Sequence, residues 1–273
     1  MIVQSAAEGA DHFVITMDQH TALSGLFAEH FGNNQFEPVE PRALMLHVIK
    51  YHDIGWRELD ALALRDPATG LPYNLVKTPF SKIVETSSAS PDTNSAHHPY
   101  CGLMSSMHSW GLYNGRYGMS DKVLLDSLAD ENRAIADAML EGEVERQERL
   151  RTELESDTDT AYLIEESRLF QNYKQLQFFD TLALYFNCVH EGARGEASYS
   201  HIPLNASEDA EVTIRPVDPG VYALDPYPFD DAEGIELSFS GRYLSPVAQG
   251  DDVRNELERA PVATQTFTLL AAA

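Results

Sequence analysis

The stretch ALMLHVIKYHDIGW, residues 43–56, ends an apolar helical pattern with a histidine and an aspartate side by side. Its apolar residues recur at the spacing of an α-helix, which predicts that one face of this helix is buried. The pair His52-Asp53 then emerges on the side of the core, and Gly55 is expected to end the helix. The sequence therefore predicts two polar side chains at the edge of a helical core.

A histidine nitrogen and an adjacent carboxylate can together bind one metal ion or bridge two. A helix that ends in a polar pair by chance is the simpler explanation, so the pair gains weight only if further ligands occur elsewhere. Three other polar residues lie in apolar helical settings: His20 in QHTALSG, His108 in SSMHSWGLY and Asp180 in FFDTLALYF. The carboxylate of Asp180 is costly to bury unless it is paired or binds a metal. For His20 and His108, a histidine packed in the core is the competing interpretation.

The chain has 273 residues, enough for a full hydrophobic core, and a net charge of −24 from 43 acidic and 19 basic residues. Such a surface repels nucleic acids and anionic membranes, so we expect neither as a partner; we expect a small-molecule substrate, and a homodimer stays open. Two cysteines, Cys101 and Cys188, are too few for a disulfide framework. No apolar run approaches the about 18 residues of a membrane span, and no signal-peptide pattern is present, so we expect a cytoplasmic protein.

Helical patterns fill most of residues 18–189, and β-like runs lie toward both ends of the chain. Two short runs within residues 1–17 predict a hairpin. Further β-branched and aromatic runs, broken by Pro-Gly and Asp-Pro, predict a small β-rich appendage over residues 196–273 that could pair with this hairpin. We therefore expect a mainly α fold, with a helical metal-binding domain over residues 1–195 followed by the appendage.

Residues 57–98 follow no sustained period. They are expected to be mostly irregular and to form a pocket wall or lid beside the candidate site. Disorder is the alternative for residues 87–95, which are rich in serine.

The order His20, His52-Asp53, Asp180 resembles the HD-domain superfamily of metal-dependent phosphohydrolases, whose defining pattern is a His, a His-Asp doublet and a distant Asp on a helical bundle. The resemblance covers residues 12–190 and is to an uncharacterised branch of that superfamily. It implies an HD-type helical bundle in which these four residues bind a divalent ion, with His108 as an extra ligand or a phosphate contact. Imidazole and carboxylate ligands suit Mn, Fe, Zn, Co or Ni, as one or two ions.

Two features depart from the family pattern. Many relatives have a phosphate-binding lysine after the glycine that follows the doublet, where this chain has Trp56. Phosphate contact would then come from another residue, or the substrate is not a phosphate ester; the candidates are Arg57, Lys50, Lys77 and Arg116. Members that bind two ions have two further histidines, for which the chain offers His98 and His108. Ten helical residues span about 15 Å, so the two cannot share one site along a continuous helix, and His108 is the stronger candidate.

The resemblance implies hydrolysis of a small phosphate ester or nucleotide by a water molecule that the metal activates. Asp53 would bind the ion and orient this water, while His98 and Glu58 are candidates for a general acid. The candidate catalytic residues are Asp53, His108 and His98. The candidate substrate contacts are Trp56, Arg57, Tyr73, Lys77 and Arg116.

Two alternatives stay open beside the hydrolase. The first is a di-iron oxygenase of the same superfamily, which two irons and oxygen uptake would favour. The second is a non-catalytic ligand-binding protein with a structural metal, which metal retention without activity would favour. Release of phosphate with Mn or Co would favour the hydrolase.

Overall fold

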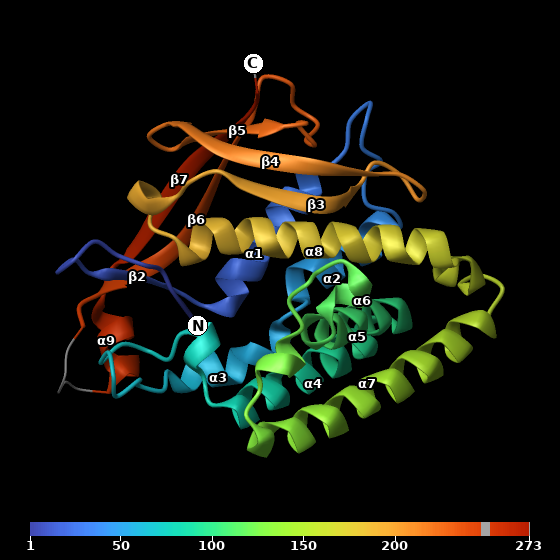
Figure 1. Cartoon of the computed structure of the whole chain (residues 1–273), viewed down its shortest axis with the longest axis horizontal. Helices are drawn as coiled ribbons and strands as arrows, with labels where there is room; N and C mark the ends of the chain where they lie inside the picture. Colours follow the sequence, from blue (N-terminus) through green and yellow to red (C-terminus); the bar gives the residue numbers. More distant parts are fainter. Residues whose placement is uncertain (247–251, 273) are drawn as a thin grey trace.

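The computed structural model describes residues 1–246 and 252–272, and within these ranges a seven-stranded mixed sheet lies to one side of the helices (Figure 1). The strand order is β1-β2-β6-β7-β5-β4-β3, and all neighbours are antiparallel except the parallel pair β5 and β7. The strands are β1 (Ile2–Val3), β2 (His12–Ile15), β3 (Ala197–Pro203), β4 (Asp209–Asp218), β5 (Val221–Asp225), β6 (Ile235–Leu244) and β7 (Val262–Ala271).

The prediction of a mainly α, HD-type bundle with a small β appendage is wrong, as is the description all-alpha. The described residues are 52% helix and 19% strand, and the sheet curls into a half-barrel, so the fold is α/β. Local sequence patterns indicate that β6 and β7 are strands, but such patterns carry no information on pairing between distant segments.

The N-terminal hairpin joins the sheet through β2, where Val14 lies opposite Arg242 of β6. The expected pairing between the two ends of the chain is therefore found.

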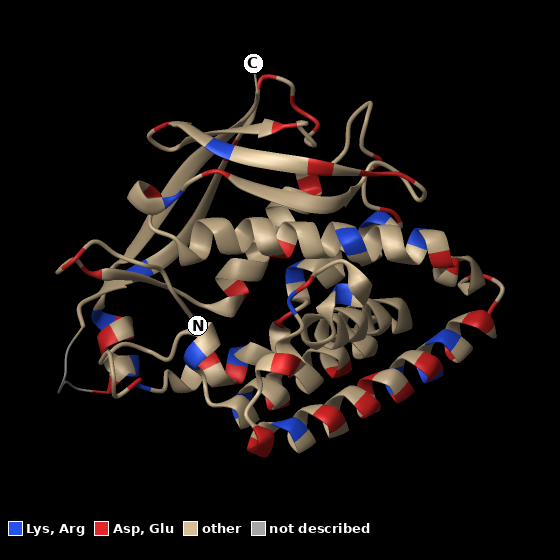
Figure 2. Ribbon diagram, in the orientation of Figure 1, with Lys and Arg blue, Asp and Glu red and all other residues tan. Residues whose placement is uncertain are grey.

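The helices carry the polar residues of interest. They are α1 (Met17–His30), α2 (Arg42–Tyr51), α3 (Arg57–Leu62), α4 (Phe80–His97), α5 (Pro99–Tyr113), α6 (Gly115–Gly118), α7 (Asp130–Glu155), α8 (Glu166–Cys188) and α9 (Val253–Arg259). In Figure 1, α8 runs between the sheet and the group formed by α2, α5 and α6. Acidic and basic residues alternate along the outer helix α7 (Figure 2), as expected of a solvated helix. Among the described residues, no helix is both long enough and apolar enough to cross a membrane.

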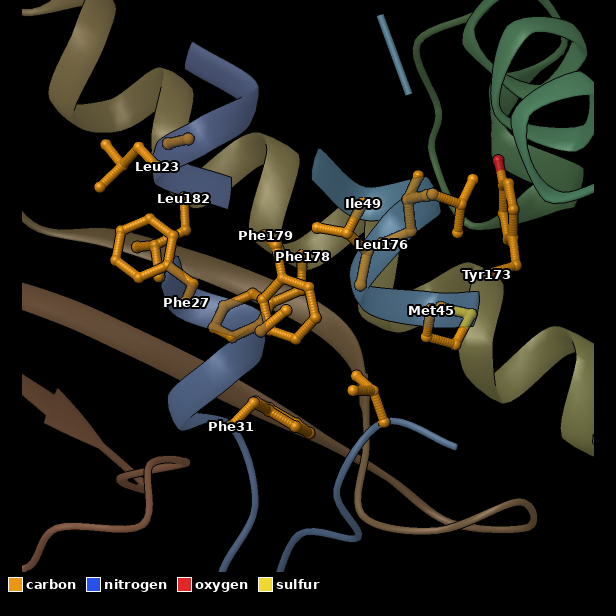
Figure 3. Packing of buried hydrophobic residues seen from close by; sticks show 14 of the residues in the cluster. Leu23, Phe27, Phe31, Met45, Ile49, Tyr173, Leu176, Phe178, Phe179 and Leu182 are labelled. Carbon is orange, nitrogen blue, oxygen red and sulfur yellow. The ribbon is translucent and has the colours of Figure 1, made fainter. Parts of the chain in front are cut away.

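Aromatic side chains join the helices to the sheet in one hydrophobic cluster. Figure 3 shows Phe31, which directly follows α1, beside Phe178 and Phe179 of α8, and the rings of Phe31 and Phe179 are 5.1 Å apart. Toward the sheet, the Phe186 ring of α8 stacks on Phe267 of β7 at a centroid distance of 3.8 Å. The position of α8 is therefore fixed from both sides, by α1 and by the sheet.

The segment predicted to be irregular contains α4, an 18-residue helix that runs through Pro91. Proline cannot donate the helical hydrogen bond to the carbonyl four residues earlier, which belongs to Ser87. The hydroxyl of Ser109 on α5 donates to this carbonyl instead, at 2.9 Å. The serines of α4 have low helix propensity, but their small side chains let α5 approach closely: a Cβ added at Gly102 would lie 2.8 Å from Ser95 Cα. Tertiary packing, which a local pattern does not reveal, stabilises this helix.

Arg194 connects the end of α8 to the sheet. Its buried guanidinium donates to the carbonyls of Phe186 and Val189 at 2.9 Å each, and to the Tyr222 hydroxyl of β5 at 2.7 Å. We expect Arg194→Ala to lower the free energy of unfolding by about 2–4 kcal/mol, because two buried acceptors and a partly buried one lose their donor. Chemical denaturation measures this, with the exposed Arg254→Ala as a control expected to change stability by less than about 0.5 kcal/mol.

A single unfolding transition shifted by Arg194→Ala would show that helices and sheet unfold together. Two transitions, with only one of them shifted, would support the predicted division into residues 1–195 and 196–273, which stays a prediction.

Candidate metal centre

The structure brings the five predicted ligand residues together from four helical segments. His20 lies on α1, His52 and Asp53 follow α2, His108 lies on α5 and Asp180 on α8. They form two overlapping groups, one of His20, His52 and Asp53 and one of His52, His108 and Asp180. Within each group, one ligand atom from every residue lies within 4.8 Å of the others.

The doublet sits at a break between two helices. α2 ends at Tyr51, and a short 3-10 turn begins at Ile54, so the prediction that Gly55 ends the helix is wrong. Asp53 leaves the helical conformation, with φ −112° and ψ 24°. The break directs the two side chains of the doublet toward α1 and α8 rather than along the surface of α2.

His20 is held by an amide oxygen on one side and a carboxylate on the other. Its Nδ1 lies 2.9 Å from Asn187 Oδ1, an acceptor, so Nδ1 carries the proton. The lone pair of Nε2 in the neutral ring then faces Asp180 Oδ1 at 3.1 Å. Two acceptors at this distance repel each other unless a proton or a metal ion lies between them.

His52 repeats this arrangement with a backbone acceptor. Its Nδ1 donates to the Ile49 carbonyl at 2.7 Å, which leaves the lone pair on Nε2. This fully buried Nε2 has no hydrogen-bond partner among the described residues. Its nearest carboxylate oxygens are Asp53 Oδ2 at 3.7 Å and Asp180 Oδ1 at 3.8 Å. An unpartnered buried nitrogen facing two carboxylates is a ligand set for a cation.

His108 has an amide neighbour, because its Nδ1 lies 2.7 Å from Gln177 Nε2 while the buried Gln177 Oε1 has no partner among the described residues. A half-turn of this amide would let Oε1 accept a proton from Nδ1 and so satisfy both groups. The His108 Nε2 lone pair would then be free for a metal ion. In this form, all three histidines donate Nδ1–H to a neutral acceptor, as metal-bound histidines usually do.

The electrostatics favour the ligand forms of two residues. Burial lowers the pKa of His108 to about 3, and the charge of His52 adds to this effect. Burial alone would raise the pKa of Asp180, but its close contacts with His20 and His52 hold the value well below its usual range. His108 is therefore neutral and Asp180 ionised near neutral pH, which are the forms that bind a metal.

The charges of His52 and Asp53 affect each other's pKa. Burial would lower the pKa of His52, but the charges of Asp53 and Asp180 outweigh it and raise the value to about 9. Burial raises the pKa of Asp53 above its usual range, although nearby histidines oppose the shift. When the His52 ring is protonated on both nitrogens, the proton on its Nε2 occupies the place that a metal ion would take.

The donor set thus fits a divalent transition metal. Three imidazole nitrogens and two carboxylates suit Zn, Mn, Fe, Co or Ni better than Ca, which prefers oxygen ligands throughout. His20, His52, His108, Asp53 and Asp180 would hold the ion. α8 also orients two of the histidines, because Asn187 contacts His20 and Gln177 contacts His108.

The other predicted residues lie elsewhere. His98 caps the start of α5 by accepting from the Tyr100 N–H at 3.1 Å, so it does not join His108. Trp56 is buried in the main core, and Tyr73 lines a separate small cavity with Met1 and Asp60. Apart from the half-buried Arg116, the remaining candidates are exposed: Arg57 pairs with Asp18 at 2.9 Å, Lys50 lies over the Tyr51 ring, and Lys77 and Glu58 are on the surface.

Three neighbours that orient the histidines were missed from sequence. Gln177 and Asn187 lie three residues before and seven after Asp180, so all three share one face of α8. That spacing was available in the sequence and could have found both amides. The Ile49 carbonyl could not be found in this way, because every residue carries such a group.

No curated protein and no solved structure matches the chain. One family model does match, over residues 1–246, and this range includes all five residues of the candidate centre. It carries the description "Protein of unknown function (DUF3891)". Because the match covers far more than half of its 273 residues, the chain belongs to the DUF3891 family.

Proposed function

We propose that this protein is a metal-dependent phosphohydrolase that acts on a small phosphate ester or nucleotide. One observation supports the metal site most directly: the buried Nε2 of His52 has no hydrogen-bond partner among the described residues and faces the carboxylates of Asp53 and Asp180. The order of the ligands along the chain, which resembles HD-domain phosphohydrolases, supports the choice of reaction. Both cysteines are free, which agrees with the cytoplasmic location that belongs to this proposal.

A divalent ion bound here would lower the pKa of water and polarise a phosphoryl oxygen. Asp53 is the ligand residue that reaches solvent, with 18% of its side chain exposed, whereas the others are at most 6% exposed or buried outright. We therefore assign Asp53 the role of orienting the attacking water and accepting its proton. Burial raises the pKa of Asp53, which is the direction expected of a general base. His20 and Asp180 are more deeply buried and would bind the ion without contacting the attacking water.

The two ligand groups share His52, which favours one ion over two. Separate sites for two ions would need a second set of ligands or a carboxylate that bridges them. This sharing is the reason why we place the di-iron oxygenase second. A ligand-binding protein with a structural metal is the third option.

We expect Asp53→Ala to lose metal and activity together, with affinity for the ion reduced by more than about 100-fold. Elemental analysis of protein without a metal-binding tag measures occupancy, and release of phosphate from aryl phosphates and nucleotides measures activity. Asp137→Ala, which removes an exposed carboxylate on α7, is the matched control and should leave both unchanged.

The outcomes separate the three functions. One Zn, Mn, Fe, Co or Ni per chain with phosphate release supports the proposal. Two irons with oxygen uptake would replace it by the oxygenase, and bound metal without either activity would replace it by the binding protein. Full occupancy in Asp53→Ala, or no metal in the wild type after reconstitution, would overturn the site.

A further inference from the structure

A strained turn follows α5, the helix that carries His108. The four residues of α6, Gly115 to Gly118, have successive φ values of 62°, 51°, 57° and 85°. Arg116 and Tyr117 also have positive ψ, at 49° and 37°, so the segment is one turn of left-handed helix. L-residues adopt this conformation at a cost in free energy and rarely do so in succession. Such strain persists where surrounding structure enforces it, often at binding sites.

Packing accounts for Tyr117. Its ring lies 4.6 Å from that of Trp110, 5.1 Å from Tyr173 and 5.4 Å from Phe170. Its hydroxyl contacts Gln147 at 3.3 Å. Tyr117 is therefore the anchor that holds the turn, and the conformation of Arg116 is a consequence of this anchoring.

The side chain of Arg116 lacks an anchor of this kind. It is half-buried, yet the described residues give its side chain no hydrogen bond and no ion pair, in a chain with 43 acidic residues. By contrast, the half-buried Arg146 contacts both Asp92 and Glu143. The turn lies against α8 through Tyr117, because the Tyr117 ring is 5.1 Å from that of Tyr173, on the face of α8 that also carries Gln177 and Asp180.

A second unpaired donor lies on α8, in the residue that packs against Tyr117. The Tyr173 hydroxyl is buried and has no hydrogen-bond partner among the described residues. Figure 3 shows the Tyr173 ring extending from α8 toward the helices α5 and α6. The hydroxyl fits against Gly111, where an added Cβ would lie only 2.0 Å away, and Gly111 is one helical turn beyond His108. Tyr173 also precedes Gln177 and Asp180 on the same face of α8.

We propose that Arg116 and the Tyr173 hydroxyl form an anion subsite beside the metal centre that binds the phosphoryl oxygens of the substrate. This inference rests on the proposed function, and it identifies the phosphoryl group as the part of the substrate that is bound here. A guanidinium donates to two oxygens of a phosphate at once, and a phenol adds a third donor. The left-handed turn keeps Arg116 away from the carboxylates of the protein surface and available to the substrate.

Inorganic phosphate is the probe for this subsite. We expect metal-reconstituted Arg116→Gln to bind it at least about 10-fold more weakly than wild type by titration calorimetry, and Tyr173→Phe to bind it about 3- to 10-fold more weakly. Arg215→Gln is the matched control, because Arg215 is exposed on β4 and also lacks an ion pair among the described residues. Metal content should be the same in all four proteins.

Arg116→Gly tests the role of the strain. Glycine adopts the left-handed conformation without cost, so we expect an unfolding temperature equal to that of wild type or higher by about 2 °C, together with the loss of phosphate binding. An arginine with a purely structural role would instead lower the unfolding temperature when removed. Unchanged phosphate affinity in Arg116→Gln and Arg116→Gly would overturn the subsite while leaving the metal centre intact. Absence of metal from the wild type would overturn the proposed function itself.

Discussion

Asp180→Asn is expected to abolish metal binding while leaving the fold intact. Asp180 Oδ1 lies 3.1 Å from His20 Nε2 and 3.8 Å from His52 Nε2, so one carboxylate oxygen faces two of the three histidines. The amide has the shape of the carboxylate but no charge, and its oxygen is a weak ligand for a transition metal. We expect affinity to fall by more than about 100-fold, which exceeds the effect of losing a residue that only orients a ligand.

The measurement is the rise of the unfolding temperature with added metal. An ion present at 100 times its dissociation constant stabilises the folded state by about 2.7 kcal/mol, which corresponds to about 5–10 °C for a chain of this size. Asp180→Asn should lose this rise. Asp209→Asn, which alters a surface carboxylate paired with Lys174, should keep it. An undiminished rise in Asp180→Asn would mean that metal binds elsewhere.

The residues of the centre were predictable because each is anomalous in its own local setting. Asp180 stands among phenylalanines and leucines on α8, and His52 follows an apolar helix, so neither needed knowledge of the fold. Their roles within the site were harder to predict. The sequence favoured His108 over His98, and the structure separates them because His98 caps the start of α5 while His108 lies among the ligand residues.

The sheet could not be derived in the same way. A strand reveals itself by its composition, but its partner depends on contacts between distant segments, such as Phe13 of β2 opposite Tyr243 of β6. The left-handed turn was also hidden. Gly115 and Gly118 mark the end of a helical pattern, but the conformation of Arg116 between them depends on the packing of Tyr117.

Gly55→Ala is expected to cause the largest loss of stability of any small substitution near the centre. Gly55 lies two residues after Asp53, and a Cβ there would stand 2.3 Å from the Thr86 carbonyl oxygen and 2.8 Å from the Ser90 backbone nitrogen. Both are backbone atoms of α4, so no side chain can rotate to make room. The whole helix must move, which we expect to cost about 2–3 kcal/mol.

The same movement should weaken metal binding. α4 contacts the segment of the doublet through two hydrogen bonds, from the Gly55 N–H to Ser90 Oγ at 3.0 Å and from Asn94 Nδ2 to the Tyr51 carbonyl at 2.9 Å. Displacing α4 strains both, and His52 lies between them. Denaturation and metal titration of Gly55→Ala measure the two effects. Gly142→Ala is the control: no atom lies within 4 Å of its added Cβ, and it is exposed within α7, so alanine should stabilise the chain by about 0.5–1 kcal/mol. If Gly55→Ala proved as stable as wild type, close approach of α4 would not be what positions the doublet.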